Sequence, residues 1–383
     1  MSHGFWQSNP TLQLTLAAFS FILGACIGSF LNVVIYRLPR SISVANPKRS
    51  FCPACQAAIP WYHNLPLLSW VVLRGKCAKC RSPISPRYLL VELVTATLFL
   101  LTYLWFRHEP WRVMPLWIFL SFCVAATYID FDHMIIPDQI TYGGTAAGIL
   151  CSVVFPWMIE RGESRWINLA HSVGGAVAGF ALVWLVVQFG KFAFGRLRYR
   201  FAEPTEWEIT QPEGEPEPIV KIGDSSHLWT DIFFRKTDRL KMACQGFRVD
   251  GEDGGAGELT LTEDSVHWEP QVGAPATWRL EDIKHLAGTT TYAVVPREAM
   301  GLGDVKFMAL VGAFLGWKGI LFTLFAASII GSLVALLMIA ARHREWAARI
   351  PFGPYLALGA ALWVFYGPAF VIWYAEFAGF AGG

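Results

Sequence analysis

The sequence predicts a polytopic, all-α membrane protein of about eight transmembrane helices, with a small cytoplasmic zinc-binding loop domain and a cytoplasmic, β-rich insertion. Its 383 residues are 54% hydrophobic and 16% charged, and the mean hydropathy is +0.40. These values are too apolar for an ordinary soluble protein. Apolar windows recur at the length that crosses about 30 Å of hydrocarbon. Two polar stretches between them carry a cysteine cluster and β-like alternation.

Eight apolar windows account for the predicted transmembrane helices. They run over residues 12–35, 88–106, 114–131, 139–159, 169–194, 304–318, 319–341 and 353–376. No basic region precedes the first window, so we expect a helix that remains in the bilayer and not a cleavable signal peptide. The chain then divides into a first helix at 12–36, a loop domain at 37–87, helices two to five at 88–199, an insertion at 200–297 and helices six to eight at 298–378.

The distribution of basic residues predicts the orientation in the membrane. Residues 37–87 contain nine Lys and Arg residues and no acidic residue, and short loops of this kind face the cytoplasm. The basic residues at 191–200 and the loop with Arg342, Arg344 and Arg349 fall on the same side, which leaves the amino terminus outside. The net charge of +2 is small, so it argues against a nucleic-acid partner.

Residues 200–297 interrupt the series of apolar windows. The segment starts polar and rich in Pro and Glu, at 203–206 and 211–218, and alternates with period two at 258–262 and around Trp278. It is too polar for lipid, and we predict a cytoplasmic insertion made of a Pro-rich linker and a small β-rich module. We assign it no chemistry. No internal repeat is evident in the chain.

Four cysteines in the first basic loop form two CxxC pairs separated by twenty-one residues: Cys52, Cys55, Cys77 and Cys80. Each CxxC turn directs two sulfurs at one ion, which suits tetrahedral thiolate coordination. The cytoplasmic location of the loop disfavours disulfides. We predict a structural Zn²⁺, because four thiolates leave no open coordination position. Another metal, a redox role and unligated cysteines are the alternatives.

Three aspartates at the ends of predicted helices are candidates for catalysis. Asp130 and Asp132 end the third window, and Asp304 follows two glycines at the start of the sixth. A carboxylate at the edge of hydrocarbon is costly, so its presence indicates a function. Asp130 and Asp132 point about 200° apart on a helix, and we expect Asp130 to pair with Asp304, with Asp132 in reserve. Pro137 ends the helix, and we expect Asp138 to cap the next one.

Two neighbouring carboxylates predict aspartyl protease chemistry. They do not both ionise readily, so one keeps a proton. The ionised carboxylate takes a proton from the attacking water, and the protonated one donates to the peptide carbonyl. Two alternatives stay open at this point: structural carboxylates paired with Lys306 or His133, and a proton relay in an ion-coupled transporter.

Further motifs lie at 28–39 (GSFLNVVIYRLP), 64–70 (NLPLLSW), 74–77 (RGKC), 130–138 (DFDHMIIPD), 301–306 (GLGDVK) and 351–359 (PFGPYLALG). Together they resemble the type IV prepilin peptidases, bifunctional bacterial leader peptidases and N-methyltransferases of the A24-type GxGD aspartyl protease family. They stand in the family's order, and the resemblance covers residues 15–195 and 298–378. It implies the same helical membrane fold.

The resemblance implies cleavage of prepilin or pseudopilin leaders after a glycine, on the cytoplasmic face of the bacterial inner membrane, with Asp130 and Asp304 as the catalytic pair. It also implies zinc at the four cysteines, S-adenosyl-L-methionine as the methyl donor, and pilus or secretion assembly proteins as partners. No glycine-rich nucleotide motif in the chain supports the methyl donor independently. The insertion departs from the family, whose fifth and sixth helices are usually joined by a short link.

The alternative function is a non-enzymatic membrane module that binds assembly partners through the zinc loop and the insertion. Intact motifs around both Asp130 and Asp304 favour the enzyme. An ion-coupled transporter would carry its charges deep within the spans, whereas these carboxylates lie at predicted helix ends.

Overall fold

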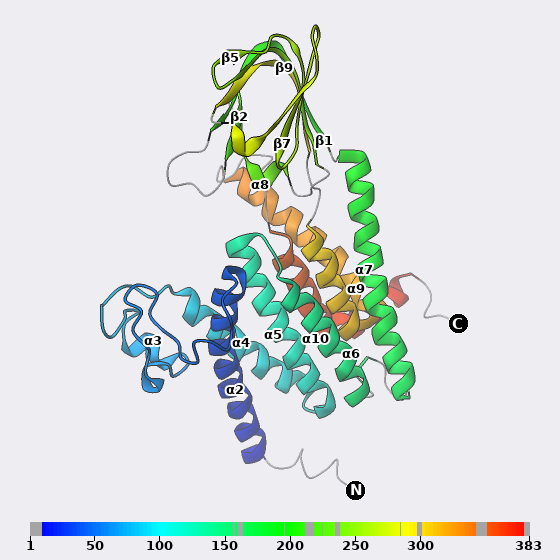
Figure 1. Cartoon of the computed structure of the whole chain (residues 1–383). Coiled ribbons are helices and arrows are strands. Elements are labelled where there is room, and N and C mark those ends of the chain that lie inside the picture. Colours follow the sequence, from blue (N-terminus) through cyan, green and yellow to red (C-terminus); the bar gives the residue numbers. More distant parts are fainter. Residues whose placement is uncertain are drawn as a thin grey trace. The chain divides into compact units, whose positions relative to one another are not determined.

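The computed structural model describes residues 10–155, 158–159, 164–194, 196–210, 218–223, 225–233, 238–283, 285–296, 301–341 and 351–378. The basic loop with Arg342, Arg344 and Arg349 and most of the polar run at 211–218 lie outside these residues. The chain divides into two compact units (Figure 1). A helical unit comprises Met1–Trp184 and Leu302–Gly383, and a second unit comprises Leu185–Gly301.

Long apolar helices make up most of the helical unit. They are α2 (Pro10–Arg37), α4 (Arg87–Phe106), α5 (Pro110–His133), α6 (Asp138–Val154), α7 (Arg165–Phe194), α9 (Leu302–Ala340) and α10 (Gly353–Phe377). The cysteine loop adds the short elements η1 (Leu38–Arg40), η2 (Trp61–His63) and α3 (Leu68–Val72). Six of the long helices, all except α6, are long and apolar enough to cross a membrane. This confirms the prediction of a polytopic membrane protein.

Two of the predicted windows share one helix. Helix α9 extends over 39 residues, and Gly316 interrupts it with φ 69° and ψ −176°. This positive φ is open to glycine at no steric cost. The windows at 304–318 and 319–341 therefore correspond to the two sides of one kink. The window at 139–159 corresponds to α6, which has 17 residues. The count of eight spans stays a prediction.

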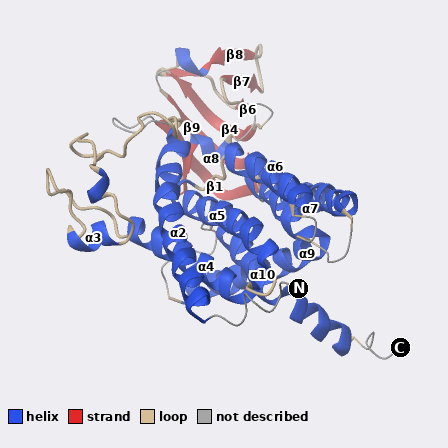
Figure 2. Cartoon of the chain, turned by 90° about the horizontal axis from the view of Figure 1, so that it is seen from below, coloured by secondary structure: helices blue, strands red, loops and turns tan. Residues whose placement is uncertain are grey.

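Small residues let the helices of the helical unit approach closely. Helix α2 packs on α4, α4 on α5, and α10 contacts both α5 and α9 (Figure 2). A Cβ atom added to Gly28 of α2 would lie 2.7 Å from the Cα atom of Glu92 in α4. The hydroxyl of Ser172 in α7 donates to the carbonyl of Ala313 in α9 at 2.7 Å. Close backbone approach and interhelical hydrogen bonds of this kind are typical of membrane helices.

The second unit contains a nine-stranded antiparallel sheet. Its strands are β1 (Arg196–Thr210), β2 (Ile219–Ile222), β3 (Ser225–Leu228), β4 (Leu240–Val249), β5 (Glu252–Asp253), β6 (Gly257–Leu261), β7 (Ser265–Pro270), β8 (Ala276–Arg279) and β9 (Leu286–Pro296). The order is β3-β2-β1-β9-β4-β6-β7-β8, with β5 paired to β4. The short helices α8 (Trp229–Ile232) and η3 (Leu280–Asp282) complete it.

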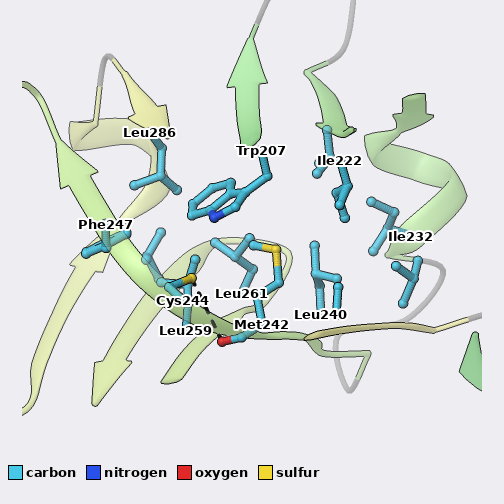
Figure 3. Close-up of a cluster of buried hydrophobic side chains, with 14 of the residues drawn as sticks. Trp207, Ile222, Ile232, Leu240, Met242, Cys244, Phe247, Leu259, Leu261 and Leu286 are labelled. Carbon is cyan, nitrogen blue, oxygen red and sulfur yellow. Dashed lines mark hydrogen bonds between the residues drawn. The ribbon is translucent and has the colours of Figure 1, made fainter. Parts of the chain in front are cut away.

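Alternating side chains give this sheet its own hydrophobic core. In β6, Gly257, Leu259 and Leu261 are buried, and Glu258 between them is exposed. Figure 3 shows Leu259 and Leu261 gathered with Trp207 and other apolar side chains of the cluster. The predicted β-rich module is thus confirmed. Its placement in the cytoplasm stays a prediction.

The predicted linker at the start of the insertion is wrong at residues 203–206. These residues lie within β1, which pairs with β9 through a register shift between Arg200 and Thr205. Pro204 falls in this shift. A proline has no N–H for a sheet ladder, and a bulge is one of the places where a strand accepts it. The polar composition was therefore compatible with a strand.

Candidate functional site

Asp130 occupies the last turn of α5 and is buried. The helix ends where Met134 adopts a left-handed conformation with φ 54° and donates its N–H to the Asp130 carbonyl at 2.9 Å. The Asp130 side chain, 5% exposed, accepts the N–H of Gly353 at 2.9 Å on Oδ2. Gly353 is the first residue of α10. The positive end of a helix dipole and a free N–H thus meet this carboxylate.

Position 353 requires glycine because the Asp130 carboxylate lies so close to its backbone. A Cβ atom there would lie 2.7 Å from Asp130 Oδ2 and 3.0 Å from Ile136 Cδ1. Any side chain would displace the carboxylate or break its hydrogen bond. The PFGP sequence of the closing motif, residues 351–354, therefore serves the aspartate site directly.

Asp304 lies in the first turn of α9 and is also buried, at 9% exposed. Its carboxylate interacts electrostatically with that of Asp130. The backbone explains how the two motifs meet. A Cβ atom on Gly303 would lie 3.3 Å from the backbone nitrogen of Ile136, so the glycine next to Asp304 packs on the residue that also contacts Gly353. Three helices, α5, α9 and α10, thus converge at one point.

Asp132 does not join this pair. It is exposed, and its carboxylate forms an ion pair with the guanidinium of Arg87 at the start of α4. The expected separation of Asp130 and Asp132 around the helix is therefore present in the structure. This geometry supports Asp130 over Asp132, and the catalytic assignment itself stays a proposal.

The prediction that Asp138 caps α6 is wrong. The helix starts at Asp138, with Pro137 in the capping position and no side-chain capping bond. The Asp138 carboxylate instead accepts the ammonium of Lys306 from α9 at 2.6 Å. Lys306 also lies over the Tyr142 ring, 5.1 Å from its centroid. Within the described residues, no ion pair joins Lys306 or His133 to Asp130 or Asp304, so the structural-carboxylate alternative loses its proposed partners.

Two carboxyl groups placed in this way can divide the work of peptide hydrolysis. A pair that carries one proton offers a general base and a general acid at the same scissile bond. Both groups are withdrawn from bulk water. Electrostatic interactions are stronger in the protein interior than in water. The arrangement therefore provides the chemistry that the two motifs predict.

The four predicted cysteine ligands lie together in the loop domain. The sulfur atoms of Cys52, Cys55, Cys77 and Cys80 all lie within 4.8 Å of one another. Such a group could hold one metal ion. The thiolate is the form that binds metal, and the backbone N–H groups of Cys80 and Lys79 lower the pKa of Cys77 to about 6. The donor set and its geometry fit zinc.

The two cysteine turns form a structural repeat that is not evident from the sequence. In the first turn, Cys52 N–H donates to Ala57 and Gln56 N–H to Cys52; in the second, Cys77 N–H donates to Ser82 and Arg81 N–H to Cys77. Gln56 and Arg81 both have positive φ, 56° and 61°. Bridges Phe51–Ala58 and Lys76–Pro83 close the two turns in the same way. The repeat aims two equivalent turns at one ion.

Buried polar side chains attach this loop to the helices. Arg37 at the end of α2 is 3% exposed, and its guanidinium donates to the carbonyls of Val44 and Pro47, both at 2.9 Å. Glu92 of α4 accepts the N–H of Leu67 on Oε2 at 2.7 Å. The loop is therefore held by charged groups of α2 and α4 as well as by the cysteine turns.

Comparisons with known proteins agree with these motifs. A model described as the bacterial peptidase A24 N-terminal domain matches residues 22–106. A model described as the type IV leader peptidase family matches residues 117–196 and 282–336. The two matched parts of the second model flank most of the sheet and include Asp130 and Asp304.

Curated relatives extend the similarity along the chain. A type 4 prepilin-like proteins leader peptide-processing enzyme from Escherichia coli is 38% identical over 193 residues, which are 46% of this chain and 67% of the relative. A prepilin leader peptidase/N-methyltransferase from Aeromonas hydrophila is 26% identical over 397 residues, covering 98% of this chain and 96% of the relative. One of the same description from Myxococcus xanthus is 29% identical over 330 residues, or 86% of this chain and 64% of the relative. No solved structure is significantly similar to the chain.

Proposed function

Because the chain belongs to the type IV leader peptidase family, it removes the leader peptide of prepilins and methylates the new amino terminus, and we propose that Asp130 and Asp304 form the peptidase site. One observation carries the proposal. Two buried carboxylates from α5 and α9 interact with each other beside the amino end of α10. A non-enzymatic assembly module is not favoured by this family membership.

In the proposed mechanism, Asp130 is the base and Asp304 the acid. The Gly353 N–H stabilises negative charge on Asp130. Asp130 accepts a proton as water forms a bond to the scissile carbonyl carbon, and Asp304 donates its proton to the carbonyl oxygen. The tetrahedral intermediate then collapses: the carbon–nitrogen bond breaks, the departing nitrogen receives a proton from Asp130, and one hydroxyl of the intermediate returns its proton to Asp304. We place the scissile bond after the glycine that ends the leader.

Co-expression with a prepilin and mass spectrometry of the product test this assignment. Asp130→Asn and Asp304→Asn should each abolish leader removal at unchanged protein abundance. Asp132→Asn is the matched control, since it removes an exposed carboxylate of the same helix, and it should leave leader removal intact. Loss of cleavage in Asp132→Asn with full cleavage in Asp130→Asn would reverse our choice between them.

We further propose that Cys52, Cys55, Cys77 and Cys80 hold a structural Zn²⁺. The proximity of four sulfurs in two equivalent turns supports this. The ion would stabilise a loop whose described residues bury few large side chains. Metal analysis of the purified protein should give one zinc per chain. A different metal, or none together with oxidised cysteines, would favour the metal or redox alternatives.

The membrane arrangement is also part of the proposal. We infer eight spans, formed by the six long apolar helices with α6 and the kink of α9, in the inner membrane of a bacterium. The cysteine loop, the sheet and the aspartate pair would face the cytoplasm, because the loop is basic and lacks acidic residues. Labelling of single introduced cysteines from each side of intact cells would test each loop. Pseudopilins and assembly proteins of pili or secretion systems are the expected further partners.

S-adenosyl-L-methionine is the proposed methyl donor, as the N-methyltransferase activity requires one. It supplies an activated methyl group on a sulfonium sulfur. Mass spectrometry of the same co-expressed prepilin reads this activity as a mass increase of one methyl group on the new amino terminus.

A further inference from the structure

A cavity of about 580 Å³ lies between the cysteine loop and helices α2 and α4. Figure 1 shows the loop that carries α3 beside these two helices. The cavity is not part of the aspartate pair, and the peptidase mechanism does not use it. Its volume is within the range of small-molecule sites, about 300–1,000 Å³. A nucleoside with an amino-acid tail fits such a volume.

An unsatisfied polar atom marks the α2 wall of this cavity. Asn32 lines the cavity and is 5% exposed. Its amide nitrogen donates to the carbonyl of Tyr88 at 3.0 Å, whereas its buried Oδ1 has no hydrogen-bond partner within the described residues. Buried polar groups are rarely left unpaired, and such an atom indicates a partner that the protein alone does not supply. A ligand with an N–H or O–H donor would satisfy it.

A carboxylate marks the α4 wall. Glu92 of α4 lines the cavity and is 9% exposed. One of its oxygens accepts the Leu67 N–H, and the Ser29 side chain of α2 also hydrogen-bonds to the carboxylate. These neutral donors fix the carboxylate in place at the edge of the loop. A buried acidic group needs a positive partner. Within the described residues, no Lys, Arg or His forms an ion pair with Glu92, so the partner expected here is a cationic ligand.

Aromatic rings provide the remaining recognition surface. Tyr36, Trp70 and Tyr88 line the cavity. The Trp70 ring is fixed by a hydrogen bond from its Nε1 to the Ile84 carbonyl at 3.3 Å. Aromatic faces attract cations and pack against flat heterocycles. Carboxylate, unpaired amide and aromatic rings together suit a ligand that joins a cationic centre to a purine.

We propose that this cavity binds S-adenosyl-L-methionine, with Glu92 facing its positive charge and Asn32 accepting one of its hydrogen-bond donors. The proposal rests on the N-methyltransferase activity given above and assigns it a site distinct from the peptidase pair. The neutral α-amino nitrogen of the cleaved product forms a bond to the methyl carbon as the carbon–sulfur bond breaks. The electron pair stays on sulfur, which becomes a thioether, and the nitrogen loses one proton to water.

The location of the cavity is consistent with two consecutive reactions on one substrate. Tyr88 lines the cavity, and the adjacent Arg87 forms the ion pair with Asp132, which is two residues from Asp130. The first turn of α4 therefore connects the cavity wall to the helix end that carries the peptidase aspartate. The cavity and the peptidase aspartate therefore belong to α4 and α5, two helices that pack on each other.

Direct binding to the purified full chain tests the site without relying on activity. Calorimetry with S-adenosyl-L-methionine and with its neutral product S-adenosylhomocysteine should show binding of both to the wild type. Glu92→Gln keeps the acceptor for the Leu67 N–H and removes only the charge. We expect it to weaken S-adenosyl-L-methionine about tenfold and S-adenosylhomocysteine much less. Glu109→Gln, at the residue before α5 and outside the cavity lining, is the control, and it should change neither affinity.

A second variant and a second readout keep the test decisive. Asn32→Leu should weaken both ligands to a similar extent, because it removes an acceptor and not a charge. Prepilin co-expressed with either variant should lose its leader and gain much less methyl, and the intact cleavage shows that the variant is folded. Unchanged affinity for S-adenosyl-L-methionine in both variants would overturn the site and leave the peptidase assignment standing. Loss of cleavage with unchanged affinity would instead assign the cavity to the leader peptide.

Discussion

The cysteine cluster takes its four thiols from residues 52–80, whereas the aspartate pair joins residue 130 to residue 304. Turns of the chain arrange the thiols, with backbone hydrogen bonds inside each CxxC segment. The packing of α5, α9 and α10 arranges the aspartates, and Gly353 and Ile136 act as spacers. The first site depends on local conformation and a bound ion. The second depends on the helical unit as a whole.

The cysteine site and the aspartate site are stabilised by different interactions. A short loop with few buried apolar side chains gains most of its stability from the metal, for which zinc-finger peptides give about 10 kcal/mol or more. The aspartate pair is buried among long apolar helices, and the packing of these helices holds its shape. Perturbations of the two regions should therefore be separable.

The largest expected effect is the loss of the loop structure when the metal is removed. Cys77→Ser should lose all bound zinc and open the segment between residues 40 and 87 to trypsin, because the second turn loses one of its two ligands. The helices should stay intact by circular dichroism. Zinc analysis and limited proteolysis measure this. Cys26→Ser, at an exposed cysteine of α2, is the control and should keep its zinc. A loop that resists trypsin equally without metal would contradict the account.

A smaller but still large effect is expected at Gly353. Gly353→Ala places a Cβ atom 2.7 Å from Asp130 Oδ2, so the carboxylate must shift. Misplacement of a catalytic group by about 1 Å can cost about 100-fold in rate, and we expect leader removal to slow by this order while zinc content is unchanged. Gly143→Ala on α6 is the control, because a Cβ atom there meets nothing within 4 Å. Equal rates for Gly353→Ala and the control would show that this contact is not important.

The smallest expected effect concerns the ion pair between Lys306 and Asp138. The Asp138 side chain of this pair is 58% exposed. Exposed ion pairs contribute only about 0–1 kcal/mol to the free energy of unfolding. Lys306→Asp should therefore slow leader removal only about fivefold by loosening α6 from α9. The reversed pair, Lys306→Asp with Asp138→Lys, should recover part of the rate. No recovery in a steady-state cleavage assay would mean that Lys306 acts in another way.

The cysteine site is predictable from the sequence because the residues that form it are close together along the chain. The CxxC spacing alone predicts the four ligands, and the structure brings all four sulfurs together. The structural repeat was missed because the two turns share little beyond their cysteines and an isoleucine, Ile59 and Ile84. Equivalent backbone hydrogen bonds do not require similar side chains.

Long-range partners were predicted less well. The Asp138 carboxylate follows a proline and resembles a helix cap, but a lysine from a helix 168 residues away takes it. The kink at Gly316 was likewise invisible to hydropathy, since glycine is common in membrane helices. Composition predicts a linker at the Pro-rich start of the sheet, because it does not reveal the bulge that accepts Pro204. The errors at Asp138 and Pro204 each involve a partner far away in the sequence.

The most direct test of the central claim is the rate of leader removal by purified Asp130→Asn, Asp304→Asn and the double variant. Residues that act as one unit are strongly non-additive. We expect each single variant to lose about 1,000-fold or more in rate, and the double variant to be no slower than either single one. A single variant that retains most of the rate, or losses that multiply in the double variant, would contradict it.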